Sequence, residues 1–129
     1  MIADAVRWWF TPGGGLKRGE EPEAALMREC WEELGVVPSD LHGPIARRHT
    51  AFEFDGKWLV QDSDFFWARI NRFEPAPGHL TALEKRFILG WRWWSPTELR
   101  YTRQTVYPAD LGALIGRVKS GADDLKPGI

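Results

Sequence analysis

The sequence lacks most features of secreted, membrane-embedded and nucleic-acid-binding proteins. It has one cysteine, Cys30, which excludes an intrachain disulfide. No apolar run is long enough to span a membrane, and the start, MIADAV, lacks the basic and apolar regions of a signal peptide. Its 17 basic and 18 acidic side chains nearly cancel, so we expect no polybasic surface for a nucleic-acid polymer or a membrane. These absences predict a soluble cytoplasmic protein.

The length and the even composition point to one folding unit. A chain of 129 residues can bury a substantial core, and no repeat, low-complexity tract or linker divides it. We therefore expect a single domain over residues 1–129.

A glycine-rich loop leads into a predicted helix, GGGLKRGEEPEAALMRECWEELGV, over residues 13–36. Consecutive glycines let a backbone approach a ligand without a Cβ in the way. Pro22 suits the first position of a helix, and Gly35 suits the position just past its end. These start and stop signals predict a helix over residues 22–34.

Three carboxylates share one face of this helix. Glu32 and Glu33 lie within roughly 60° of Glu29, whereas Cys30 and Leu34 lie on the opposite side. We expect the second face to pack and the first to be acidic. Carboxylates this close raise each other's pKa unless a cation lies among them, and oxygen ligands suit Mg²⁺ or Mn²⁺. The alternative is a solvated charged face without a ligand.

The stretch resembles the Nudix box at every fixed position and spacing. The matching residues are Gly14, Glu20, Arg28-Glu29-Cys30, Glu32-Glu33 and Gly35-Val36. Cys30 stands where the family usually has an aliphatic residue, and a buried free cysteine behaves as a small apolar side chain. The resemblance implies an α/β fold, a Nudix-type α/β/α sandwich with a mixed sheet.

The chain departs from the family ahead of the box. Proteins of this family normally carry two further strands before the stretch that matches RWWFTPGGG. Either the true start lies upstream, or the sheet lacks its first strands and another segment or another subunit fills the open edge. An unfilled edge would promote aggregation. The second option predicts a homodimer through that edge.

Local patterns predict the remaining elements. Asp55-Gly56 is a two-residue hairpin signal, and Ser95-Pro96-Thr97-Glu98 is a capping box that begins a short helix ending near Arg100. Residues 108–119 have apolar positions at helical spacing. We expect a loop at 38–44, a frayed tail from 121, and strands at 7–11, 45–54, 57–61, 64–70 and 87–94.

The resemblance also implies a metal site and a reaction. Nudix enzymes hydrolyse the pyrophosphate linkage of nucleoside diphosphates joined to another group, using divalent cations. Carried over, the metal ligands would be Glu29, Glu32 and Glu33, with the Gly13 carbonyl as a further oxygen. The ions would neutralise the diphosphate and lower the pKa of an attacking water.

Other residues are assigned less directly. Arg28 would orient a carboxylate or close the loop through Glu20, and a purely structural ion pair is an equal alternative. The family's catalytic base often comes from outside the box, and Glu84 is our candidate beside Glu29 and Glu32; the alternative for Glu84 is an exposed carboxylate with no chemical role.

Substrate binding is assigned to three cations, Lys17, Arg47 and Arg48, which would meet phosphates. Aromatic residues at strand spacing either stack on a base or pack in the core: Phe52, Phe54, Phe66, Trp67 and Trp91. The three histidines, His42, His49 and His79, do not have metal-ligand spacing, so none is assigned a role.

Two functions agree with these patterns. The first is a Mg²⁺-dependent hydrolase of nucleoside diphosphate-linked compounds, such as nucleoside triphosphates or oxidised nucleotides. The alternative is a catalytically weak or inactive Nudix-like module that binds a small nucleotide. The complete set of Glu29, Glu32 and Glu33 favours the enzyme.

Overall fold

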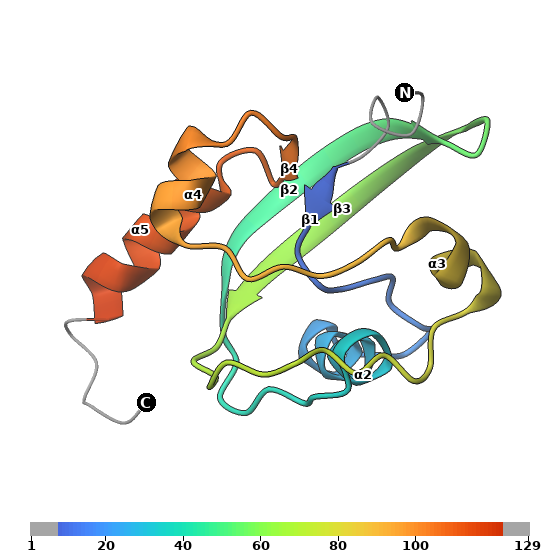
Figure 1. The fold of residues 1–129 in the computed structure, drawn as a ribbon. Helices are drawn as coiled ribbons and strands as arrows, with labels where there is room; N and C mark the ends of the chain where they lie inside the picture. The colour runs from blue at the N-terminus through green and yellow to red at the C-terminus, as the bar shows by residue number, and fades with distance from the viewer. Residues whose placement is uncertain (1–7, 123–129) are drawn as a thin grey trace.

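The computed structural model describes residues 8–122 (Figure 1). Four strands and four helices follow one another along the described residues: β1 (Trp9–Phe10), α2 (Pro22–Leu34), β2 (His42–Phe54), β3 (Lys57–Trp67), α3 (Ala82–Phe87), α4 (Pro96–Tyr101), β4 (Val106–Tyr107) and α5 (Leu111–Ala122). The predicted α/β class is confirmed. Figure 1 shows α2 on one side of the long β2–β3 hairpin and α4 with α5 on the other side.

The described strands form two separate two-stranded sheets rather than one mixed sheet. β1 pairs with β4 in parallel, and β2 pairs with β3 in antiparallel. The parallel pair is short because each of its strands has only two residues. Of the predicted strand 7–11, Trp9 and Phe10 are in β1, whereas residue 7 lies outside the described range.

The predicted hairpin is confirmed, with Phe54 paired to Lys57 across the Asp55-Gly56 turn. Its arms are longer than expected. The predicted strands 57–61 and 64–70 are one strand, since the polar residues between them continue the ladder against β2. This strand ends at Trp67, so residues 68–70 were wrongly included. The predicted loop 38–44 is also partly wrong, because β2 begins at His42, which pairs with Trp67 across an irregular step.

Helix α2 has the predicted bounds. It ends where Gly35 adopts φ 76° and donates its N–H to the Trp31 carbonyl, and a side chain there would come within 2.5 Å of the Ala76 carbonyl oxygen. The predicted division into a packing face and an acidic face is wrong. Glu29 and Glu33 are buried with the apolar residues of the helix, because the glycine loop and α3 cover the acidic side.

The predicted strand 87–94 is also wrong. Residue 87 ends α3, and residues 88–94 form no strand. The tryptophans of this segment pack by their rings instead: the Trp93 indole donates to the Phe73 carbonyl at 3.0 Å, and Trp94 meets Trp9 edge-on. Aromatic residues favour strands because their side chains pack well on the surface of a sheet. When the rings contact other parts of the chain instead, aromatic content no longer predicts a strand.

The C-terminal elements follow their local signals. The capping box of Ser95 and Glu98 is present and begins α4, which ends at Tyr101. α5 begins at Leu111, three residues later than predicted, after the buried Pro108. The predicted frayed tail lies mostly outside the described residues. Within residues 8–122, no helix combines the length and apolar character needed to cross a membrane.

Candidate active site

The glycine loop lies directly against the acidic side of α2. A Cβ on Gly14 would overlap the carboxylate of Glu29, so only glycine fits at this close approach. The neighbouring Gly13 donates its backbone N–H to Glu33 Oε2 at 3.3 Å. The loop therefore covers two carboxylates that the helix alone would leave exposed.

Arg28 joins the loop to the helix with all five of its N–H donors. Its Nε and Nη2 donate to the two oxygens of Glu20 at 2.9 and 3.0 Å, and Nη2 also donates to the Gly15 carbonyl at 3.0 Å. Its Nη1 donates to Glu29 Oε1 at 2.9 Å and to Glu32 Oε2 at 3.2 Å. One guanidinium thus closes the loop and orients two carboxylates.

A third carboxylate reaches the helix from a distant part of the chain. Glu84, in α3, offers an oxygen that lies with oxygens of Glu29 and Glu33 within 4.8 Å of one another. A capping box holds Glu84 in place: Thr81 N–H donates to Glu84 Oε1 at 2.9 Å, and Glu84 N–H donates to Thr81 Oγ1 at 3.1 Å. We call Glu29, Glu33 and Glu84 the acidic cluster.

Burial dominates the electrostatics of the cluster. Glu33 is 4% exposed, and desolvation raises its pKa to about 8, against the opposing effect of the Gly13 N–H. Desolvation also raises the pKa of Glu29, which is 8% exposed, although the Arg28 hydrogen bond opposes the rise. By contrast, the hydrogen bonds from Arg28 lower the pKa of Glu20 to about 2.

The acidic cluster fits a divalent cation. Within the described part of the chain, the Glu33 carboxylate accepts one hydrogen bond, from Gly13, and forms no ion pair with arginine or lysine. Glu29 is paired with Arg28, whereas Glu33 has no neutralising side chain among the described residues. Carboxylate oxygens gathered in this way are the ligands that hard ions such as Mg²⁺ prefer. Glu29, Glu33 and Glu84 would therefore hold the ion.

A cavity of about 370 Å³ opens beside the cluster. Three segments form its walls: the glycine loop, α2 and the start of α3. The lining residues are Gly14, Gly15, Lys17, Arg28, Glu29, Glu32, Thr81 and Glu84. A cavity lined by Lys17 beside clustered carboxylates suits a phosphate chain bound together with cations.

Most of the predicted site residues lie at this cavity. Glu29, Glu32, Glu84 and Lys17 line it, and Glu33 stands next to it in the cluster with Gly13 hydrogen-bonded to its carboxylate. Glu32 contacts Arg28 and is not one of the three clustered carboxylates. The roles of these residues stay predictions.

The predicted phosphate ligands Arg47 and Arg48 are elsewhere. Both are on β2 and neither lines the cavity. Arg47 donates hydrogen bonds to the Asp64 carboxylate from Nε at 2.7 Å and from Nη2 at 3.1 Å. Arg48 forms an ion pair with Asp110. Their role in substrate binding stays a prediction, and the cavity geometry does not favour it.

Sequence reasoning missed Thr81, which lines the cavity and positions Glu84. The spacing of Thr81 and Glu84 is that of a capping box, so a signal was available. Among residues 8–122, the histidines join no carboxylate cluster. His42 stacks on Trp67, His49 hydrogen-bonds Asp62 at 2.6 Å, and His79 lies beside Trp31.

Comparisons with known proteins agree with the geometry. The family model described as NUDIX domain matches residues 3–114. An RNA pyrophosphohydrolase from Roseobacter denitrificans is 31% identical over 106 residues, covering 73% of this chain and 64% of that protein. The chain thus spans less than two thirds of that relative's length. No solved structure matches. Because the family model covers most of the chain, this protein belongs to the Nudix family.

Proposed function

We propose that this protein is a Mg²⁺- or Mn²⁺-dependent hydrolase that cleaves a pyrophosphate bond in nucleoside diphosphate-linked compounds, such as nucleoside triphosphates or oxidised nucleotides. The observation that carries the proposal is the acidic cluster of Glu29, Glu33 and Glu84 beside a cavity that Lys17 lines. Membership of the Nudix family supports it, as does the relative named as a pyrophosphohydrolase.

The cluster would hold the divalent ion. A cation bound there would neutralise phosphate charge and lower the pKa of a water molecule. Two further oxygens could complete the set, the Gly13 carbonyl and the Glu32 carboxylate, which is adjacent on α2. The raised pKa of Glu33 is consistent with a buried carboxylate whose charge needs a bound cation.

Three residues of the site have separate proposed roles: Lys17, Arg28 and Glu84. Lys17 forms no ion pair among the described residues, so its ammonium is available to a phosphate. Arg28 has no N–H left for a substrate and acts as a positioning residue. Glu84 uses one oxygen in its cap, so its other oxygen has one of two roles, as a ligand of the cation or as the base that takes a proton from water.

The test is a substrate screen with and without Mg²⁺. Nucleoside triphosphates, nucleotide sugars and a 5′-triphosphate RNA oligonucleotide are offered, and phosphate or pyrophosphate release is measured. We expect metal-dependent release by the wild type, none by Glu33→Gln, and normal release by Glu23→Gln, an exposed glutamate on the same helix. Nucleotide binding without any release would instead support the non-catalytic module.

Three further expectations from the sequence stay predictions: the single domain over residues 1–129, the cytoplasmic location and the homodimer through an open sheet edge. The substrate is proposed to be a small nucleotide. The RNA in the screen tests that choice against the activity in the relative's name.

A further inference from the structure

The cavity contains nothing that would recognise a nucleobase. Each of its eight lining residues is a glycine, a charged residue or a threonine. Such a lining can hold phosphates and cations, but a planar base gains most from stacking on an aromatic ring. A nucleoside whose phosphates occupy the cavity must therefore place its base beyond the rim.

An exposed aromatic pair is formed by near neighbours of residues in the cavity wall. Trp31, on α2, is 49% exposed, and its ring lies 6.0 Å from the ring of His79 at 31° between the planes. Trp31 is three residues from Arg28, so their Cβ atoms are about 5–6 Å apart. It also directly precedes Glu32, and both of these neighbours line the cavity.

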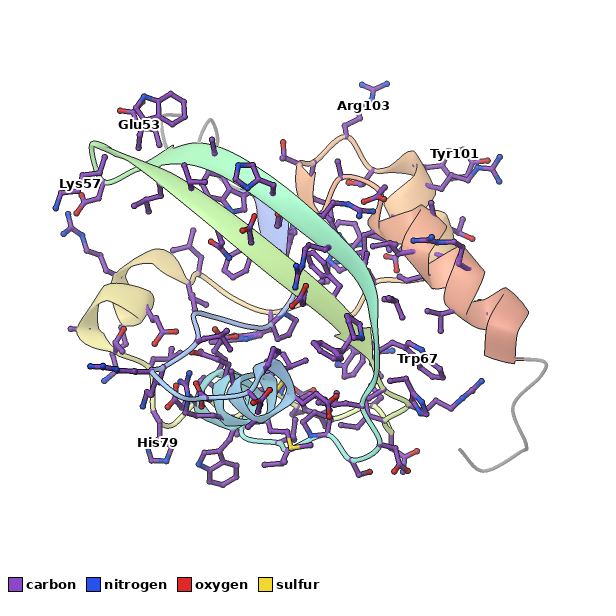
Figure 2. The ribbon with its side chains drawn as sticks, turned by 180° about the vertical axis from the view of Figure 1, so that it is seen from behind. Glu53, Lys57, Trp67, His79, Tyr101 and Arg103 are labelled. Atoms are coloured by element: carbon purple, nitrogen blue, oxygen red, sulfur yellow. The ribbon has the colours of Figure 1, made fainter. Side chains whose placement is uncertain are left out.

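The partner ring comes from the opposite wall. His79 is two residues before Thr81, which lines the cavity at the start of α3. Figure 2 shows His79 beside α2, on the side of the helix away from the hairpin. The pair therefore links two of the cavity's three walls just outside the polar lining.

Other exposed apolar residues fit this role less well. Leu16 is exposed on the glycine loop, but it has no ring on which a base could stack. Among the described residues, the remaining exposed aromatic side chains lie on β1, β3, α4 or segments that contribute nothing to the cavity wall: Trp8, Phe10, Trp58, Trp91, Trp93 and Tyr101.

We propose that Trp31 is a specificity-determining residue that stacks on the nucleobase of the substrate, with His79 as the positioning residue that holds the indole in place. The inference rests on the proposed function for its substrate class. Because every base has a stacking face, this contact selects nucleosides over bare polyphosphates and tolerates different bases.

The test compares a substrate that has a base with one that has none. Turnover of adenosine triphosphate and of inorganic tripolyphosphate is measured with Mg²⁺ for the full chain and for Trp31→Ala. We expect the KM for adenosine triphosphate to rise about tenfold with kcat unchanged, and tripolyphosphate turnover to stay the same. Trp31→Phe should restore most of the affinity, and His79→Ala should give a smaller rise.

The matched control is Trp58→Ala, which removes an exposed tryptophan from β3, away from the cavity. It should leave both substrates unaffected. An unchanged KM for adenosine triphosphate in Trp31→Ala overturns the inference. An equal rise for tripolyphosphate also overturns it, since Trp31 would then support the cavity rather than bind a base.

Calorimetric binding separates this inference from the proposed function. A methylene-bridged adenosine triphosphate analogue and tripolyphosphate are titrated in the presence of Mg²⁺. Tighter binding of the analogue by the wild type, lost in Trp31→Ala, supports the inference even if no substrate is cleaved, which would defeat only the hydrolase proposal. Equal binding of the two ligands by the wild type overturns the inference whatever the turnover.

Discussion

Arg28 donates two parallel hydrogen bonds to the carboxylate of Glu20, at 2.9 and 3.0 Å, and so joins α2 to the glycine loop. The remaining N–H groups of the same guanidinium reach Gly15, Glu29 and Glu32. Arg28 therefore pairs with Glu20 and also contacts two carboxylates of α2, and its orienting role in the reaction stays a prediction. The loop and two carboxylates depend on one side chain.

Arg28→Lys should damage the site although it keeps the charge. An ammonium has three donors and no planar fork, so it cannot serve five acceptors on opposite sides. We expect the free energy of unfolding to fall by about 2 kcal/mol and turnover to fall about tenfold or more. Urea denaturation and steady-state kinetics measure both. Arg103→Lys, at an exposed arginine between α4 and β4, is the control and should change neither. Wild-type turnover in Arg28→Lys would refute the positioning role.

Glu33→Gln should weaken metal binding. The substitution keeps the shape of the side chain but removes the charge of the most buried member of the acidic cluster. We expect the Kd for Mn²⁺, measured by calorimetry, to rise at least about tenfold. Glu23→Gln, on the exposed side of α2, should leave the Kd unchanged. Equal Kd values for Mn²⁺ in the wild type, Glu33→Gln and Glu23→Gln would show that the cluster is not a metal site.

Glu84→Gln separates chemistry from structure, because glutamine also completes a capping box. Turnover should fall about 100-fold while α3 keeps its cap. Glu84→Ala should lose the cap as well, at a cost of about 1 kcal/mol in the free energy of unfolding. Kinetics and thermal denaturation distinguish the two variants. Near-normal turnover in Glu84→Gln would remove this residue from the mechanism.

The metal-free protein should lose stability as pH rises from about 5 to about 8. Burial raises the pKa of Glu33 to about 8 in the folded state from 4.5, so the folded state holds a proton that the unfolded state has released. Stability is then greatest below the unfolded value and falls through this window. Urea denaturation in a chelator should show the decline, and Glu33→Gln should flatten it. An equally steep fall of stability with pH in Glu33→Gln would contradict the assignment of this pH dependence to Glu33.

Cys30 should be inert in the folded protein. The thiol is buried on α2, and desolvation raises its pKa to about 11, so little thiolate is present at neutral pH. We expect its alkylation by iodoacetamide at pH 8 to be at least about tenfold slower in the native chain than in urea. Mass spectrometry follows the modification. Equal alkylation rates in the native chain and in urea would show that the packing of α2 is looser than the structure indicates.

Several elements were predictable because their signals are local. Pro22 and Gly35 bound α2 through backbone geometry that a few neighbouring residues determine. The Asp55-Gly56 turn and the Ser95–Glu98 capping box act over four residues or fewer, and both occur as predicted. The predicted strand 87–94 was wrong: Trp93 and Trp94 contact distant residues, Phe73 and Trp9, and strand propensity depends on what the side chains pack against.

The sequence by itself determined the helix bounds, the hairpin turn and the order of residues that identifies the Nudix box, since each is a relation between near neighbours. Only the tertiary structure decided that Glu29 and Glu33 are buried and that Glu84 joins them, while Glu32 is held by Arg28. The physical reason is that burial and the approach of charges from distant segments arise from the loop and α3 closing over α2.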